Sequence, residues 1–353
     1  MTSIPNTTTA TPNVGEYEDP TIPPFPAKVT MIIAYCFIFL LGTIGNATVV
    51  YIVAKSPRKR TMSDTLLLSL SVIDLLGSIN VPFIMIYDLL YTQWYFGSVL
   101  CKIIPSMNTF TLCGSAWSLA FIALDRLRII LFPFNARVSP TKKVATVILI
   151  WLIAIVITFP YANNHVADET GCWARYDSLN NQYVYVAIFC IVTCVIPTII
   201  MTISYVISTL KMKKTVKVQT TRKASVVRKE QSQRLTKMFA LIVGVFVILT
   251  TPYLIFLFTF MYYATYRLET FMEHRVLLSA LNYALFTFAA FNSCVNCVIY
   301  AKMHTGVKTF YRTMRRSVRT ASVISSLSQD NTAVTHETAA TIDRARKKSI
   351  IPM

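Results

Sequence analysis

Residues 144–162 read VATVILIWLIAIVITFPYA and contain no charged side chain. A helix needs about 20 mostly apolar residues to cross ~30 Å of bilayer hydrocarbon, and this stretch has the required length and composition. Further stretches of the same kind cover residues 29–54, 65–91, 99–131, 183–210, 236–263 and 276–301. The sequence therefore predicts an all-α membrane protein with a seven-helix transmembrane bundle.

The regions outside the bundle are short. The bundle itself is expected to span residues 29–301, after a polar N-terminal tail at 1–28. Residues 302–316 predict a short amphipathic cytoplasmic helix, because Val307, Phe310, Tyr311 and Met314 recur at helical spacing opposite basic residues. Residues 317–353 are rich in Ser and Thr without apolar periodicity, which indicates a disordered tail.

The cations are unevenly distributed between the two sides of the predicted bundle. Of 34 Lys and Arg residues, 29 lie in segments that share one side, namely 55–60, 126–143, 211–237 and the tail from Lys302 onward. Lys and Arg mark cytoplasmic loops, so the N-terminus is expected outside a multi-pass plasma-membrane protein. The net charge of +18 then reflects topology and attraction to anionic membrane lipid, and it is not a nucleic-acid footprint.

The N-terminal tail carries candidate modification sites. Asn6-Thr7-Thr8 is a glycosylation sequon on the side predicted to be extracellular. Acidic residues flank Tyr17, a pattern that is compatible with tyrosine sulfation but is more typical of an ordinary acidic, solvated tail.

Six of the eight cysteines fall inside predicted spans, where they are expected to pack between helices. Cys101 and Cys172 are the two at the outer side, an oxidising compartment, and we expect them to form a disulfide that pins the second outer loop over the bundle.

Polar residues inside spans are costly in hydrocarbon and need a reason. Asp74 lies in the middle of the second span, with other polar groups at comparable depth: Asn46, Ser115, Asn292, Ser293 and Asn296. One carboxylate and several neutral oxygens suit a hard monovalent cation such as sodium. A hydrated hydrogen-bond network without an ion fits the same residues.

Asp125 and Arg126 stand together at the cytoplasmic end of the third span. They predict either a simple interfacial pair or a switch in which Asp125 releases Arg126 when the bundle opens.

These residues resemble the landmarks of the rhodopsin-like family of G-protein-coupled receptors over about 28–316, nearly the whole folded chain. The matching positions occur in order along the spans: Asn46, Asp74, Trp94 before Cys101, Asp125-Arg126, Trp151, Pro197 with Tyr205, Pro252, and Asn296 with Tyr300. Three motifs depart from the pattern. Leu127 follows Asp125-Arg126, Thr250 replaces the span-six tryptophan, and Cys297 replaces the span-seven proline.

The resemblance implies functions for several residues. The family's sodium pocket maps onto Asp74, Ser115, Asn292, Ser293 and Asn296, as an allosteric site with no required cofactor. Asp125, Arg126, Tyr205 and Tyr300 would form the G-protein switch, and segment 211–237 the surface that couples to a heterotrimeric G protein. Kinases and arrestin would act on the C-terminal tail.

Two positions in the spans argue against particular classes of ligand. Asn108 stands where amine receptors carry an aspartate, and the seventh span has no lysine for retinal. The outer face carries nine acids against five bases, which favours a short basic neuropeptide, C-terminally amidated. By position in the family, the pocket would use Asn108, Thr109, Leu112, Trp173, Tyr253, Leu257, Asn282 and Phe286.

Alternatives remain open from the sequence. A receptor of this fold for a non-peptide ligand, or one without G-protein coupling, fits most of the same residues. A transporter is less compatible because no internal repeat is visible. An enzyme is not expected, since the four histidines show no metal-ligand spacing.

Overall fold

The computed structural model describes residues 25–55, 60–86, 94–132, 138–169, 171–216, 223–303 and 320, with side chains described except within 212–239 and 300–303. Within these ranges, seven helical segments are long and apolar enough to cross a membrane, which confirms the predicted fold class. Asn6, Tyr17, the apolar residues of the predicted amphipathic helix and nearly all of the C-terminal tail lie outside the described residues.

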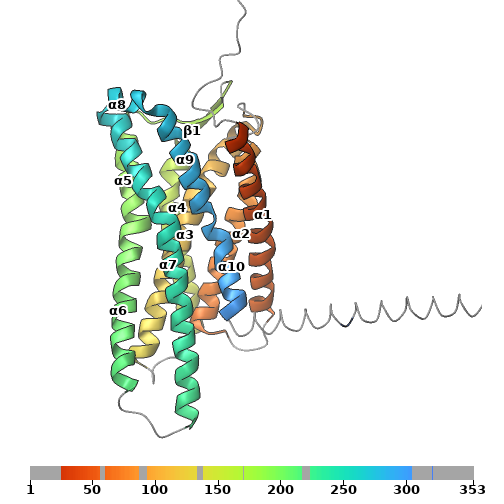
Figure 1. Cartoon of the computed structure of the whole chain (residues 1–353), viewed down its shortest axis with the longest axis vertical. Coiled ribbons are helices and arrows are strands. Elements are labelled where there is room, and N and C mark those ends of the chain that lie inside the picture. The colour runs from red at the N-terminus through yellow and green to blue at the C-terminus, as the bar shows by residue number, and fades with distance from the viewer. Residues whose placement is uncertain are drawn as a thin grey trace, which may run out of the picture.

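The spans run side by side in one bundle (Figure 1). They are α1 (Phe25–Ala54), α2 (Met62–Met85), α3 (Gly97–Leu131), α4 (Pro140–Asn163), α5 (Leu179–Cys190) continued by the π-helical η3 (Ile191–Val195) and α6 (Ile196–Val216), α7 (Lys223–Tyr266), and α9 (Arg275–Ala290) followed by α10 (Asn292–Met303). The short α8 (Leu268–Glu273) joins α7 to α9. Helix α3 contacts α2, α4, α6 and α7, so it lies at the centre of the bundle.

Polar residues between the apolar stretches define where several helices begin. The Thr61 side chain accepts from the backbone N–H of Asp64, whose carboxylate accepts in return from the Thr61 N–H, forming a capping box for α2. Ser139 caps α4 directly before Pro140, and Ser178 caps α5. Local sequence therefore specifies these starts without help from tertiary contacts.

The helices differ from the predicted spans in three places. Segment 211–237, predicted as a loop, is helical up to Val216 and again from Lys223, because hydropathy marks only the part of a helix that lies in hydrocarbon. The fifth span widens into η3 just before Pro197, which lacks the N–H that a regular turn would use. The seventh span breaks at Phe291, whose carbonyl accepts from both Cys294 and Val295.

The second interhelical loop at the α8 end forms a β-hairpin. Strand β1 (His165–Asp168) pairs antiparallel with β2 (Gly171–Ala174), with Asp168 opposite Gly171. A disulfide joins Cys101 of α3 to Cys172 of β2, which confirms the predicted bridge. We call this end of the bundle the hairpin end.

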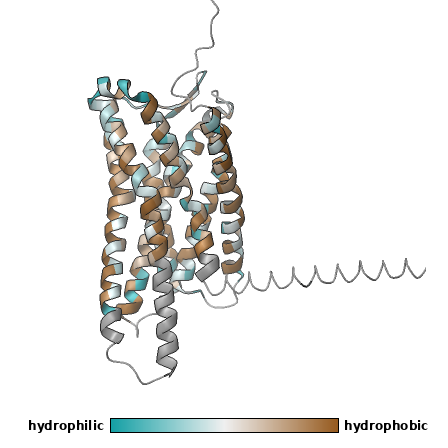
Figure 2. Cartoon of the chain, viewed as in Figure 1, coloured by the Kyte–Doolittle hydropathy of each residue, from teal (hydrophilic) through white to brown (hydrophobic). Residues whose placement is uncertain are grey.

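Helix α4 shows how the bundle meets the bilayer. It buries a single stripe at a spacing of four residues, formed by Ile150, Ala154 and Thr158. Large apolar side chains cover its outer face, among them Ile148, Leu152, Ile155, Val156 and Phe159. Figure 2 shows hydrophobic residues along much of the helical ribbon in the bundle. Such a surface is stable against lipid tails, which are as apolar as these side chains.

Candidate functional site

A cavity of about 430 Å³ lies between the hairpin and the helices of the bundle. Its walls come from β1, β2 and most of the spanning helices. They include every residue that the sequence analysis placed in the ligand pocket: Asn108, Thr109, Leu112, Trp173, Tyr253, Leu257, Asn282 and Phe286. The helices therefore bring together positions that are up to 178 residues apart in the chain.

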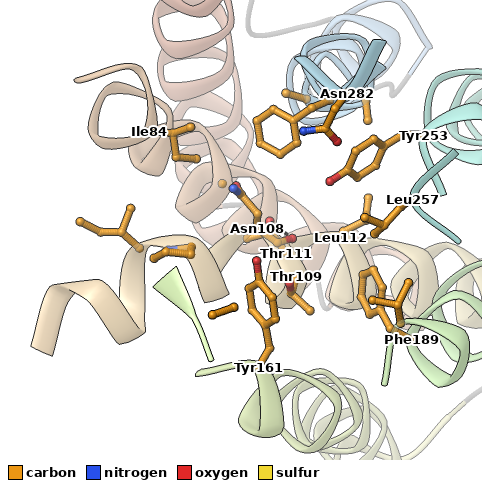
Figure 3. A pocket seen from close by; sticks show the side chains of 18 of the residues that line it. Ile84, Asn108, Thr109, Thr111, Leu112, Tyr161, Phe189, Tyr253, Leu257 and Asn282 are labelled. Atoms are coloured by element: carbon orange, nitrogen blue, oxygen red, sulfur yellow. Dashed lines mark hydrogen bonds between the residues drawn. The ribbon is translucent and has the colours of Figure 1, made fainter. Parts of the chain in front are cut away.

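The cavity has neutral walls. No Asp, Glu, Lys or Arg is among the described residues that line it. Figure 3 shows the amide groups of Asn108 and Asn282 and the hydroxyls of Tyr161 and Tyr253 pointing into the enclosed space. Aromatic and aliphatic surface with a few converging neutral polar groups is the usual composition of a site for an uncharged organic ligand group.

Neighbouring side chains hold these groups in place. The Asn80 amide donates to the Ile104 carbonyl at 2.9 Å and approaches Asn108 Oδ1 at 3.4 Å, so the oxygen of Asn108 already has a donor. Tyr253 packs edge-on against Phe286 with ring centroids 5.7 Å apart. Such aromatic contacts restrict rotamers and fix the cavity wall.

The sequence analysis missed a second polar wall made by α4, α5 and the hairpin. Tyr161, His165, Gln182 and Tyr185 also line the cavity. The rings of Tyr161 and Tyr185 stack at 5.8 Å, and His165 Nδ1 lies 2.7 Å from the Tyr161 carbonyl. Both tyrosines lie at the hairpin ends of their helices, Tyr161 in α4 and Tyr185 in α5, where the packing of the helices brings their rings together.

His165 is a buried titratable group of the hairpin. Burial lowers the pKa of its imidazole below the ordinary 6.5, and the contact with the Tyr161 carbonyl opposes this shift in part. The ring is therefore neutral at physiological pH, which is consistent with the uncharged cavity wall.

Deeper in the bundle, Asp74 is fully buried and joins three helices. Ser115 Oγ donates to its Oδ1 at 2.8 Å, and Asn296 Nδ2 donates to its Oδ2 at 2.9 Å. Asn46 Nδ2 donates to the Ser293 carbonyl at 2.7 Å. The cavity extends to this cluster, since Ser115, Asn292 and Ser293 are also part of its lining.

The donor set around Asp74 fits a hard monovalent cation. The side-chain oxygens of Asn46, Ser71, Asn292 and Asn296 are buried without a hydrogen-bond partner among the described residues. Oxygen ligands with a single formal charge are suited to sodium. The predicted ligands therefore lie in one region, and Asn46 and Ser71 add oxygens that the sequence analysis did not assign as ligands.

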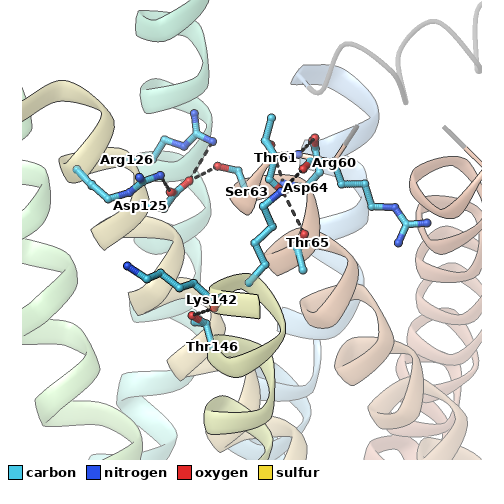
Figure 4. A network of polar contacts seen from close by, with 11 residues as sticks. Arg60, Thr61, Ser63, Asp64, Thr65, Asp125, Arg126, Lys142 and Thr146 are labelled. Atoms are coloured by element: carbon cyan, nitrogen blue, oxygen red, sulfur yellow. Dashed lines mark hydrogen bonds and ion pairs between the residues drawn. The ribbon is translucent and has the colours of Figure 1, made fainter. Parts of the chain in front are cut away.

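The predicted switch lies at the opposite end of α3. Arg126 Nη2 is 3.7 Å from Asp125 Oδ2. Asp125 has two nearer partners that the sequence analysis missed: Arg128 at 2.8 Å and the hydroxyl of Ser63 on α2. Figure 4 shows Ser63, Asp125 and Arg126 in this network. Arg128 could have been found from its spacing, because residues three apart on a helix share a face.

Of the other two predicted switch residues, the structure describes the side chain of Tyr205 alone. The Tyr205 side chain is 48% exposed on the surface of α6. The side chain of Tyr300 lies outside the described residues. Near the middle of α7, Thr250 replaces the family's tryptophan and is fully buried, with no described partner for its hydroxyl.

Comparison with known families decides the identity of this bundle. Residues 45–300 match the family described as 7 transmembrane receptor (rhodopsin family). The chain belongs to this receptor family. The match extends from the first span to the last and covers more than half of the chain, which confirms the resemblance found in the motifs. The family consists of signalling receptors, and the receptor is therefore not an enzyme.

Individual relatives are peptide receptors at moderate identity. The neuropeptide receptor npr-1 of Caenorhabditis elegans is 27% identical over 204 residues, which are 55% of this receptor and 44% of the relative. The neuropeptide Y receptor type 2 of Cavia porcellus is 28% identical over 238 residues, covering 64% and 61%. The type-1 angiotensin II receptor of Gallus gallus is 27% identical over 288 residues, covering 78% of each. The receptor thus spans about half the length of the first two relatives.

Proposed function

We propose that this receptor binds a short neuropeptide at the hairpin end and activates a heterotrimeric G protein at the opposite end. The observation that carries the proposal is the neutral cavity beside the hairpin, lined by all eight residues expected from family position. The relatives support it, since they are receptors for neuropeptides and for angiotensin II.

The hairpin end is proposed to face the extracellular side of the plasma membrane. The argument is the distribution of Lys and Arg, of which 29 of 34 lie in segments at the other end. The disulfide between Cys101 and Cys172 supports the same orientation, because such bonds persist in oxidising compartments. Asn6 would then be available for glycosylation.

The chemistry of the cavity favours one part of a peptide over others. A charged group without a counter-charge is costly to desolvate, and the described lining offers none. An amidated C-terminus is neutral and matches the amide and hydroxyl groups of Asn108, Asn282 and Tyr253. Basic residues of the peptide would remain at the rim, where Glu169, Asp177, Glu269 and Glu273 add negative charge.

We further propose that sodium binds beside Asp74 and stabilises the closed bundle. The unpartnered oxygens around this carboxylate support the assignment. The ion would supply positive charge to a buried carboxylate, and Ser115 and Asn296 would orient it.

G-protein activation would use the Arg126 end. In the closed bundle Arg126 lies near Asp125, and opening would let it meet Tyr205, Tyr300 and the G protein. The long helices α6 and α7 contain most of the basic segment 211–237 and would carry the coupling surface. Kinases and arrestin would act on the tail, and the basic loops would contact anionic lipid.

The test is a screen of peptides in matched pairs, each as the C-terminal amide and as the free acid. Cells would express the receptor with a promiscuous G protein, and calcium would be read. We expect activation by a basic amidated peptide, a weaker response to its acid form, and loss of both in Arg126→Ala.

Other outcomes would redirect the proposal. Activation only by acidic peptides or by lipids would contradict a basic peptide ligand. Specific peptide binding without any calcium response would favour a receptor that does not couple to G proteins. An Arg126→Ala variant that signals like the wild type would reject Arg126 as the switch.

A further inference from the structure

Asp125 has three described partners, and Arg126 is the most distant of them. Arg128 Nη2 donates to Oδ1 at 2.8 Å, and Ser63 Oγ donates to Oδ2. Arg126 approaches the same Oδ2, at 3.7 Å. Each carboxylate oxygen therefore has a nearer donor than Arg126, the residue that Asp125 is expected to restrain.

The distances rank these contacts. At 2.8 Å the Arg128 contact is a charge-assisted hydrogen bond, whereas 3.7 Å is beyond hydrogen-bond reach and leaves only Coulomb attraction. Arg126 is the more buried arginine, with 13% of its side chain exposed against 31% for Arg128, so its attraction to Asp125 is less screened by water although it lies farther away. Of the two arginines, Arg128 is thus the one that is hydrogen-bonded to Asp125.

The competing contacts are well anchored. Arg128 lies three residues after Asp125 on the same helix, where side chains share a face. Ser63 stands in the first turn of α2, two residues after the Thr61 cap and directly before Asp64, so its backbone is fixed by the capping box. The contact between Ser63 and Asp125 also ties the end of α2 to the end of α3.

We propose that Arg128 and Ser63 are positioning residues that compete with Arg126 for Asp125 and thereby weaken the restraint on Arg126. The consequence for signalling rests on the proposed G-protein coupling, whereas the competition itself does not. Arg128 and Ser63 thereby set the ligand-free activity of the receptor. The more firmly Arg128 holds Asp125, the more readily Arg126 leaves Asp125.

The two substitutions that follow are expected to change ligand-free signalling in opposite directions. Arg128→Ala frees Oδ1 and lets Arg126 bind both oxygens, so ligand-free signalling falls. Asp125→Asn removes the restraint altogether, so ligand-free signalling rises. If Arg128 only supported the fold, its loss would not strengthen the closed state.

The first experiment measures ligand-free second-messenger output with a promiscuous G protein, normalised to surface receptor. We expect roughly a fivefold decrease in Arg128→Ala, the effect of a modest change in a two-state equilibrium. Arg128→Lys restores part of the output because it keeps the charge, and Ser63→Ala lowers output by vacating Oδ2. In the Asp125→Asn background, Arg128→Ala has no further effect. Unchanged or increased output in Arg128→Ala overturns the proposal.

The second experiment needs neither a ligand nor a G protein. Apparent melting temperatures of purified receptor would be measured for Asp125→Asn, Arg128→Ala and Arg126→Ala, and for each double variant with Asp125→Asn. We expect non-additive shifts for Asp125 with Arg128 that exceed those for Asp125 with Arg126. Additive shifts for the Arg128 pair would reject the competition.

The two experiments separate the failures. A silent wild-type receptor whose melting shifts are non-additive for Arg128 contradicts G-protein coupling and keeps the ion-pair assignment. A receptor that signals but shows additive melting shifts for Asp125 with Arg128 keeps G-protein coupling and contradicts the ion-pair assignment.

Discussion

Asp74 is fully buried, and two described side chains donate to it, those of Ser115 and Asn296. A carboxylate has room for about four hydrogen bonds, and a buried charge without compensation is costly. Several neighbouring oxygens are also without a described partner. At the scale of single residues, the Asp74 carboxylate has fewer donors than it can accept, and the oxygens near it lack donors as well. Both observations point to a bound cation.

This deficit predicts a sodium effect on stability. Replacing sodium chloride by choline chloride should lower the apparent melting temperature of the purified receptor by roughly 2–4 °C, the shift that ~1 kcal/mol gives a domain of similar size. Asp74→Asn should remove the sodium dependence. Ser69→Ala, on the same helix but bonded to Trp151, should keep it. An Asp74→Asn variant as sensitive to sodium as the wild type would reject the site.

His165 predicts a dependence on pH. Because burial lowers its pKa in the folded receptor, the unfolded chain binds the proton more tightly, and stability is lost as pH falls below about 6.5. Melting at pH 7.5 and 5.5 should show a decrease for the wild type and a smaller one for His165→Gln, which keeps a donor for the Tyr161 carbonyl. Equal decreases in both would mean that other groups cause the effect.

At the scale of elements, the β-hairpin supplies a wall of the cavity that the helices do not form. The disulfide to α3 holds β2 in place, and Trp173 of β2 forms part of the wall. Gly171 starts this strand with φ +148°, a conformation that side chains rarely adopt. A Cβ at this position would also lie 2.9 Å from the Trp173 ring.

Gly171→Ala should therefore weaken ligand responses by tilting Trp173, as well as destabilising the hairpin by ~1–2 kcal/mol of backbone strain. Gly97→Ala is the matched control, because Gly97 has φ +73° but no atom within 4 Å of an added Cβ. Dose–response curves at equal surface expression should show a larger loss for Gly171→Ala. Equal losses would assign the effect to backbone strain alone.

At the scale of the whole molecule, α3 connects the two ends that the proposed function needs. Asn108 lines the cavity and Asp125 stands 17 residues further along the same helix, a separation of about 25 Å at 1.5 Å per residue. Ser115, bonded to Asp74, lies between them. A ligand effect carried along α3 to Arg126 would therefore pass the Asp74 cluster.

The distribution of cations predicts the orientation of the whole molecule. An epitope tag at the N-terminus should be detected on intact cells, and a C-terminal tag only after permeabilisation. Asn6→Gln should remove a glycosidase-sensitive increase in mass. Detection of the C-terminal tag on intact cells would reverse the assignment of the two ends.

The sequence by itself determined the seven spans, the cysteine pair and the starts of several helices. These features depend on short-range physics: apolar length against bilayer thickness, oxidising location, and caps such as Thr61 with Asp64. Family position also named eight residues that prove to share one cavity. Helix ends beyond the hydrocarbon, at Val216 and Lys223, were not visible because hydropathy reports only the membrane.

Only the tertiary structure decided which groups meet. A span that is apolar all round gives no sign of which stripe faces protein, as in α4, where Ile150 is buried and Ile148 faces lipid. The neutral wall with Tyr161 and His165 depends on how the hairpin folds over the helices. The bond between Ser63 and Asp125 joins residues 62 positions apart. Such contacts arise from helix packing, which no local pattern in the chain encodes.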